Sequence, residues 1–340
     1  MFAIPPAPIH FREIFKTKVW GARRLETLLG KSLPPGEPVG ESWEISDHPH
    51  GLSRVDAGVL AGMSLHDLVP PMRDEIALVG RPGALELGNR FPLLFKFIDT
   101  ADFLSVQVHP ADDYARKNEQ GDPGKIEAWV VVHAEPGARI ALGLKPGTTR
   151  REFSRAVETG DVEQHLRFVP VRRRDVFVVP PGTVHAVGPG VLLAEIQQNS
   201  DATYRLYDWG RMGLDGKPRD LHVEKALDVI DFAASAAPAS VPELLPDGPA
   251  RHERLVANAK FTLDRYACDA PFELRPADLR SFVILACIAG RAELACSDGT
   301  SPMSPGRTLL LPASLRTLTV RPAGPVELLA MSLPIPGGSQ

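Results

Sequence analysis

Four residues in the first two thirds of the chain have the types that bind a divalent metal: Gln107, His109, Glu127 and His185. Two imidazoles and a carboxylate suit zinc or another divalent first-row metal, and an amide oxygen can fill a further position. Each residue alone is more often a hydrogen-bonded core or surface side chain. Their combination at three separate strand ends indicates a metal site.

The strand expected over 103–110, Phe-Leu-Ser-Val-Gln-Val-His-Pro, presents two of these residues on one face. Apolar and polar side chains alternate along it, so Ser105, Gln107 and His109 point the same way. A surface strand with its polar side in water shows the same alternation. The other candidate residues favour a strand that lines a ligand site.

Glu127 and His185 lie on other expected strands. Glu127 is near the start of a strand over 124–132 and shares a face with Lys125. His185 follows an apolar strand over 176–179 and a Pro-Pro-Gly turn. We also expect a mostly apolar strand over 91–100 interrupted by Lys96, and a strand pair over 191–207 in which polar residues alternate with apolar ones.

Helices are expected in three places. Ser64 can cap a helix from Leu65 to about Val79, which Pro70 and Pro71 break early. A small helical insertion spans about 148–166, and a further helix spans 221–232. Around Trp43, residues 42–46 alternate as in a half-buried strand, which lies either at a sheet edge or along a pocket.

The pattern as a whole predicts a mainly β protein. Residues 1–232 form a first, metal-binding domain, 233–249 an Ala/Pro-rich linker, and 250–340 a second domain of short strands. The spacing of Gly306, Pro312, Ser314 and Thr317 repeats that of Arg174, Pro180, Gly182 and His185. The repeat lacks the histidine, so we expect two related β-barrels, of which the second is degenerate and only the first binds metal.

Composition excludes several classes of protein. The 340 residues are 44% hydrophobic and 24% charged, with a formal net charge of -4. No long basic run or long apolar run occurs, so neither nucleic acid nor a membrane is an expected partner. Residues 1–21 carry prolines and charges where a secretory signal needs an apolar core, so a cytoplasmic location is expected. The three cysteines lack a Cys-x-x-Cys spacing and are expected to pack in the core.

The His/Glu/His arrangement is the metal-binding pattern of the cupin jelly-roll barrel, with Arg174 at a position usually occupied by glycine. The chain further resembles the type I mannose-6-phosphate isomerases in their short bacterial form. The segments that carry the resemblance are 20–21, 40–44, 103–110, 124–127, 181–185 and 195–205. The resemblance is strong over about 10–232, and after residue 232 it concerns mainly the order of the expected strands.

The resemblance implies one zinc ion per chain, held by Gln107, His109, Glu127 and His185, with Arg205 in the active site. It also places five residues around a sugar phosphate substrate: Lys96, Ser105, Lys125, Glu195 and Asp201. Ile126 stands where the family usually has Thr or Ser, so the metal ligand is retained, but we expect a missing hydroxyl either near the substrate or among the residues that support the site.

The implied reaction interconverts mannose 6-phosphate and fructose 6-phosphate through a cis-enediol. Such a reaction needs a Lewis acid and a nearby acid/base, for which Lys125, Glu195 and Asp201 are candidates. Lys96, Lys125, Arg205 and Arg211 can supply cations for the phosphate, although ordinary ion pairing explains each of them equally well. Two other functions stay open: a non-catalytic sugar-phosphate-binding or regulatory cupin, and an iron-dependent cupin oxygenase. The oligomeric state does not follow from the sequence.

Overall fold

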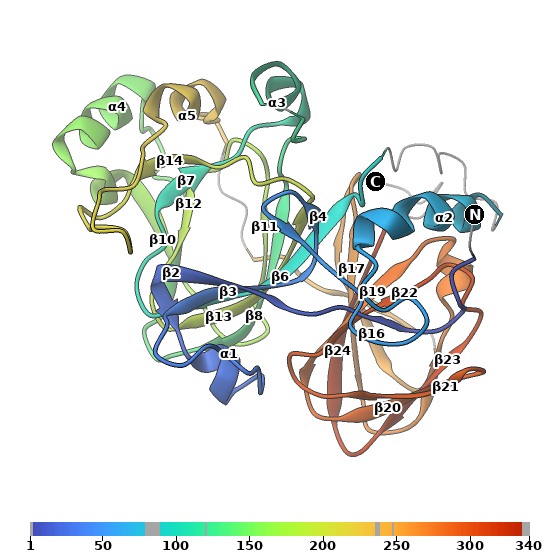
Figure 1. The fold of residues 1–340 in the computed structure, drawn as a ribbon. Coiled ribbons are helices and arrows are strands. Elements are labelled where there is room, and N and C mark those ends of the chain that lie inside the picture. Colours follow the sequence, from blue (N-terminus) through green and yellow to red (C-terminus); the bar gives the residue numbers. More distant parts are fainter. Residues whose placement is uncertain (1–2, 79–88, 120, 235–238, 247, 335–340) are drawn as a thin grey trace.

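The computed structural model describes residues 3–78, 89–119, 121–234, 239–246 and 248–334. Strands dominate it, and four larger antiparallel sheets stack as layers (Figure 1). The predicted mainly β, jelly-roll-like fold is confirmed. The sheets pack face to face in two sandwiches and do not close into continuous barrels.

The first sandwich consists of a six-stranded and a five-stranded sheet. The six-stranded sheet has the order β11-β8-β13-β6-β2-β3. Its strands are β2 (Ile14–Ala22), β3 (Val39–Ile45), β6 (Leu93–Thr100), β8 (Glu127–Ala134), β11 (Val176–Val179) and β13 (Val191–Gln198). The five-stranded sheet has the order β10-β9-β12-β7-β14. Its strands are β7 (Val106–Val108), β9 (Arg139–Leu144), β10 (Leu166–Pro170), β12 (His185–Val187) and β14 (Tyr204–Tyr207).

The second sandwich consists of a seven-stranded sheet, β1-β22-β19-β24-β17-β16-β15, and a four-stranded sheet, β18-β23-β20-β21. The seven strands are β1 (Ile9–His10), β15 (Glu243–Leu245), β16 (Arg251–Ala257), β17 (Thr262–Cys268), β19 (Val283–Ala289), β22 (Thr308–Leu311) and β24 (Val326–Ser332). The four strands are β18 (Phe272–Leu274), β20 (Ala292–Cys296), β21 (Gly299–Met303) and β23 (Leu318–Pro322). A separate small hairpin joins β4 (Asp47–His48) to β5 (Gly51–Leu52).

The helices are α1 (Arg24–Thr27), α2 (Leu65–Leu78), α3 (Asp112–Asn118), α4 (Arg150–Thr159) and α5 (Val223–Val229), with 3-10 turns at Val162–His165 and Pro276–Leu279. The predicted helical insertion is confirmed as α4, which ends at Gly160 in the left-handed region with φ of 81°. Its predicted last residue, Leu166, instead begins β10. Figure 1 shows α3, α4 and α5 together at one end of the first sandwich. None of the described helices is long and apolar enough to span a membrane.

Helix α2 corrects the expected break at Pro70 and Pro71, because the helix continues through both prolines. Each proline removes one backbone hydrogen bond, which disfavours a helix interior. The apolar face of α2, including Leu68, Met72 and Ile76, is however buried in the core, and this packing holds the helix together. Ser64 caps it as predicted, since its hydroxyl accepts a hydrogen bond from the backbone nitrogen of Asp67 at 3.2 Å.

Three apolar layers hold the four sheets together. One fills the first sandwich, one fills the second, and the largest lies between the six-stranded and seven-stranded sheets with α2. On β13, for example, Leu192 and Ile196 face the largest layer, while Leu193 faces the inside of the first sandwich. The strand period of two therefore decides which side chains line the interior of the first sandwich.

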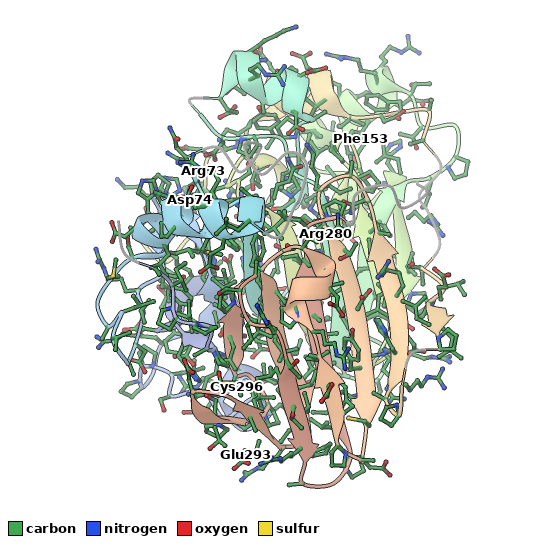
Figure 2. The ribbon with its side chains drawn as sticks, turned by 90° about the vertical axis from the view of Figure 1, so that its right-hand side faces the viewer. Arg73, Asp74, Phe153, Arg280, Glu293 and Cys296 are labelled. Atoms are coloured by element: carbon green, nitrogen blue, oxygen red, sulfur yellow. The ribbon has the colours of Figure 1, made fainter. Side chains whose placement is uncertain are left out.

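The two sandwiches share one type of connection at the residues of the sequence repeat. After β11 the chain crosses to β12 in the five-stranded sheet, and after β22 it crosses to β23 in the four-stranded sheet. Arg174 lies just before β11 and Gly306 just before β22, with φ of 78° and 82°. A left-handed turn is thus kept at both positions, although only Gly306 has the residue that favours it. Figure 2 views the second sandwich from the side, with Glu293 and Cys296 of β20 near the bottom.

Two further expectations are wrong. The strands over 191–207 do not pair with each other, because β13 lies between β6 and β8 whereas β14 pairs with β7. The strand around Trp43 is buried along its whole length, and the carboxylate of Glu44 is paired with the buried Lys31 at 2.7 Å. Val79, residue 120, parts of the expected linker (235–238 and 247) and both ends of the chain (1–2 and 335–340) lie outside the described residues.

Candidate metal centre and active site

His109 and His185 approach each other from two strand ends of the five-stranded sheet, with ring centroids 4.8 Å apart. His109 Nδ1 donates to the carbonyl of Ala202 at 2.8 Å, and His185 Nδ1 donates to the carbonyl of Thr183 at 2.9 Å. These backbone acceptors fix both tautomers, so each Nε2 carries a lone pair. Both imidazoles therefore present the atom that a metal would bind.

Glu127 faces these imidazoles from the first residue of β8, in the opposite sheet. Its Oε1 lies 3.1 Å from His109 Nε2, and its Oε2 lies 3.7 Å from His185 Nε2. Within the described part of the chain, His109 Nε2 and Glu127 Oε2 are buried without a hydrogen-bond partner. A buried imidazole nitrogen and carboxylate oxygens with lone pairs facing one another are unfavourable unless a cation lies between them.

Gln107 completes the donor set. Its amide Nε2 lies 3.2 Å from His185 Nε2, and its Oε1 accepts from the Ser105 hydroxyl at 3.3 Å. Because amide oxygen and nitrogen exchange places by a half turn, Oε1 can equally face the imidazoles. Zinc bonds of about 2.0–2.1 Å place tetrahedral ligand atoms about 3.3 Å apart, close to the spacings found here. The donor set therefore fits a divalent first-row metal ion.

The charge states also fit a metal. Burial lowers the pKa of His109 to about 3, and the neighbouring Lys125 adds to this shift. Burial likewise lowers the pKa of His185. For Glu127, burial alone would raise the pKa, but Lys125 and His109 outweigh it and hold the pKa well below the usual range. Two neutral imidazoles and an ionised carboxylate are the forms that bind metals.

Two lysines and a second glutamate surround this group. Lys125 Nζ lies 3.0 Å from Glu127 Oε1, and Lys96 Nζ lies 3.0 Å from Glu195 Oε1. Trp129 donates its indole N–H to Glu195 Oε2 at 2.7 Å. All four charged side chains are buried. Burial, and next the charge of Glu127, raise the pKa of Glu195.

The alternation of the strands explains why these residues meet. Lys96, Glu127 and Glu195 lie on the same faces of β6, β8 and β13 as the apolar residues that fill the first sandwich, such as Ile98 and Leu193. The interior of the sandwich is apolar over most of its length and polar at the end where these three residues lie. The charged residues balance one another there, as buried charges must.

Arg205 lies in the same row as two of the candidate ligands. In the five-stranded sheet, His185 pairs with Gln107 and Gln107 pairs with Arg205. Directly opposed residues of neighbouring strands point to the same face, so Arg205 belongs on the metal side. Its Nη1 donates to the carbonyl of Asp220 at 2.6 Å. No carboxylate among the described residues pairs with it, while Asp208 is occupied by Arg211 and Arg219.

Asp201 lies at the rim of the group. His50 Nδ1 contacts its carboxylate at 2.7 Å, and its backbone N–H donates to Asp122 at 3.0 Å. Burial alone would raise its pKa, but Lys125 and the hydrogen bond from His50 lower it. His48, His50 and Asp201 form a second cluster of metal-binding residue types. Both of its imidazoles already face carboxylates, so it lacks the unpaired buried atoms of the first group.

Ile126 lies between Lys125 and Glu127, two residues of this site. Its side chain packs against the apolar layer on the other face of the sheet, while Lys125 and Glu127 point inward. The effect of Ile126 in place of Thr or Ser stays a prediction. Trp129, which donates to Glu195, is not among the predicted site residues, although an indole two residues after Glu127 on the same face was a usable signal.

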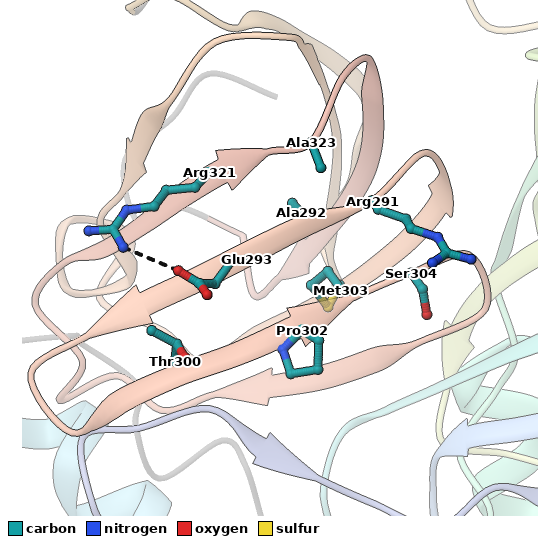
Figure 3. A pocket seen from close by; sticks show the side chains of 9 residues that line it. All are labelled: Arg291, Ala292, Glu293, Thr300, Pro302, Met303, Ser304, Arg321 and Ala323. Carbon is teal, nitrogen blue, oxygen red and sulfur yellow. Dashed lines mark hydrogen bonds and ion pairs between the residues drawn. The ribbon is translucent and has the colours of Figure 1, made fainter.

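A surface hollow of about 450 Å³ lies elsewhere, against the four-stranded sheet (Figure 3). Arg321 and Glu293 form an ion pair of 3.2 Å beside it. It shares no residue with the His109 group.

Fold and site together define a two-sandwich β protein with a buried donor set for a divalent metal. The profile of the catalytic domain of type I phosphomannose isomerase matches residues 9–140. The mannose-6-phosphate isomerase ManA of Bacillus subtilis is 35% identical over 316 residues, which cover 91% of this chain and 94% of ManA. The mannose-6-phosphate isomerase of Streptococcus mutans is 33% identical over 310 residues, with coverages of 91% and 94%.

The crystal structure of the mannose 6-phosphate isomerase from Bacillus subtilis has a TM-score of 0.87 at 33% identity, and covers 96% of this chain and 99% of that one. The chain belongs to the type I mannose-6-phosphate isomerase family. The resemblance found in the sequence is confirmed.

Proposed function

We propose that the protein is a zinc-dependent aldose–ketose isomerase that interconverts mannose 6-phosphate and fructose 6-phosphate through a cis-enediol. The observation that carries this proposal is the pair of unpartnered buried atoms, His109 Nε2 and Glu127 Oε2, surrounded by buried Lys96, Lys125 and Glu195. Membership of the family supplies the substrate class. The proposed enzyme works in the cytoplasm on a small sugar phosphate.

The proposed metal site holds one zinc ion per chain. Gln107, His109, Glu127 and His185 would hold it, and when bound it supplies a Lewis acid for the negative charge that develops on the substrate oxygens. Residues 1–232 are the proposed catalytic domain. Residues 250–340 are the proposed degenerate copy, in which Ser314 and Thr317 stand where Gly182 and His185 stand in the first.

The reaction moves one proton from C2 to C1 of mannose 6-phosphate, and another from the C2 oxygen to the C1 oxygen. Lys125, Glu195 and Asp201 are the candidates for these transfers. We favour Glu195 because burial, and next the charge of Glu127, raise its pKa, and a raised pKa is typical of carboxyl groups that act as general acids and bases. Lys96, at 3.0 Å, fixes its orientation.

Cationic side chains stabilise the charge that the substrate brings and the charge that develops. In the described part of the chain Arg205 has no carboxylate partner, and it lies in register with Gln107, so we infer that its guanidinium can bind an anionic oxygen. Lys96 lies on the opposite sheet, Lys125 lies two residues before β8 of that sheet, and Ser105 lies beside Gln107. The site would thus enclose the reacting carbons between fixed donors that cost no rearrangement during the reaction.

The test combines metal analysis with a coupled assay that follows fructose 6-phosphate formed from mannose 6-phosphate. We expect one equivalent of zinc and turnover that is lost on chelation and regained with zinc. Glu195→Gln should lose at least about 10²-fold in kcat, as general acid–base catalysis contributes 10²–10⁴-fold, and should retain its metal. A metal-replete protein that binds mannose 6-phosphate without turning it over would instead be a sugar-phosphate-binding cupin.

A further inference from the structure

One side chain of the second sandwich, that of Lys260, contacts a residue that is hydrogen-bonded to the segment containing Lys125. Lys260 lies in the turn between β16 and β17 and reaches Asp112, at the start of α3, with its Nζ 2.6 Å from Asp112 Oδ2. Within the turn, the side chain of Asn258 accepts hydrogen bonds from the backbone N–H groups of Lys260 and Phe261. Phe261 is fully buried in the apolar layer between the sandwiches.

Asp112 is hydrogen-bonded, directly or through Gln198, to the backbone on both sides of Lys125. Its Oδ1 accepts from the backbone N–H of Gly124 at 2.9 Å and from Gln198 Nε2 at 2.9 Å. Gln198 in turn accepts from the backbone N–H of Ile126 through its Oε1 at 3.2 Å. One carboxylate therefore holds the backbone before Lys125 directly and the backbone after it through a single amide.

The packing around these bonds leaves little room for other positions. A Cβ atom on Gly124 would lie 2.3 Å from the backbone nitrogen of Asp112, so the two segments touch without a side chain between them. The backbone N–H of Lys125 donates to the carbonyl of Pro110 at 3.0 Å. The lysine side chain itself is 3% exposed and reaches Glu127.

The positive charge of Lys260 also affects the carboxylate of Asp112. Burial alone would raise the pKa of Asp112, but the hydrogen bonds from Lys260 and Gln198 lower it below the usual value. With Lys260 removed, the donors that Asp112 keeps among the described residues are the neutral N–H groups of Gly124 and Gln198, and its Oδ2 loses a charge-assisted hydrogen bond.

We propose that Lys260, from the second sandwich, is a positioning residue for the reaction: through Asp112 and Gln198 it holds the backbone that sets the place of Lys125 beside Glu127. The inference rests on the proposed function only for its effect on turnover. It also gives the degenerate half of the chain a role in the active site of the other half.

The test compares Lys260→Met with Arg173→Met. Arg173 forms another ion pair between the sandwiches, at 2.8 Å from Glu327, and its side chain is 44% exposed against 41% for Lys260. A purely structural role predicts the same small fall in melting temperature for both variants and no loss of turnover. Misplacing a reacting group by 1 Å can cost about 10²-fold. We expect Lys260→Met to lose about tenfold in kcat with little change in KM, Arg173→Met to keep kcat, and Lys260→Arg to recover it.

A second measurement does not need the reaction. Hydrogen exchange of the peptide covering 111–126 should quicken in Lys260→Met and stay as in wild type in Arg173→Met. Quickened exchange in a protein without isomerase activity would sink the proposed function and leave the structural part of the inference standing. Wild-type exchange, or wild-type kcat despite quickened exchange, would overturn the positioning role of Lys260.

Discussion

Arg205→Ala offers the sharpest test of the proposed chemistry. The guanidinium makes one hydrogen bond to the carbonyl of Asp220 among the described residues, and its Nε is buried without a partner. Burial, and next the charge of Arg219, lower the pKa of Arg205. The proposed role of this buried cation, in register with Gln107, is to bind an anionic ligand rather than to stabilise the fold.

The size of the effect follows from these contacts. Removing one fixed donor from a developing oxyanion costs about 2.7–4 kcal/mol, or about 10²–10³ in kcat. The folded protein loses one hydrogen bond worth about 1 kcal/mol, and loses repulsion from Arg219 as well. We therefore expect Arg205→Ala to fold, to keep its metal, to melt within a few degrees of wild type, and to lose kcat by about 10²–10³ with a smaller change in KM.

Arg219→Ala is the matched control. Arg219 binds both oxygens of Asp208, at 2.7 Å and 2.5 Å, and is the structural arginine of this cluster. Its loss should lower the melting temperature and leave turnover per folded molecule nearly intact. Metal content, thermal midpoint and steady-state kinetics are measured on the same preparations. Near wild-type turnover in metal-replete Arg205→Ala would remove Arg205 from the mechanism.

Three further predictions concern metal and pH. His185→Ala should lose the single equivalent of zinc found in wild type, and elemental analysis showing that equivalent still bound would contradict the proposed ligand set. The pKa of His109 is about 3 and that of His185 is also lowered, so both imidazoles stay neutral in mildly acidic solution. Zinc affinity, measured by competition with a chelator, should therefore change less than tenfold between pH 7 and 5. A site with two histidines of ordinary pKa would lose about 10³-fold in zinc affinity over the same range. Burial raises the pKa of Glu75 to about 7, so Glu75 favours folding below its unfolded pKa of about 4.5 and loses this contribution as the pH rises to 7. Glu75→Gln should accordingly raise the melting temperature more at pH 8 than at pH 5, and an equal change at both would refute this sign.

Several features could be predicted from local pattern because they depend on the chain nearby. The alternation over 103–110 fixes that Ser105, Gln107 and His109 share a face, whatever the strand pairs with. The Ser64 cap and the end of α4 at Gly160 are likewise local. The same residue types at strand ends, with the family segments, indicated the metal donor set and the fold.

Local pattern failed where distant packing decides the outcome. Pro70 and Pro71 break helices in isolation, yet α2 continues because its apolar face is buried between the sandwiches. The two strands over 191–207 look like a hairpin, yet β13 and β14 belong to different sheets. Ile126 lies directly before β8, and only the packed structure showed that its side chain contacts the apolar layer.

The sequence by itself determined which residues can bind a metal and which face of each strand they occupy, because side-chain direction in a strand follows from its period of two. Only the tertiary structure decided that Arg205 lies in register with Gln107 and His185, that Glu195 is paired with Lys96, and that Lys260 reaches Asp112. Lys260 and Asp112 are 148 residues apart, and such contacts depend on how the sheets pair and stack, which no local pattern encodes.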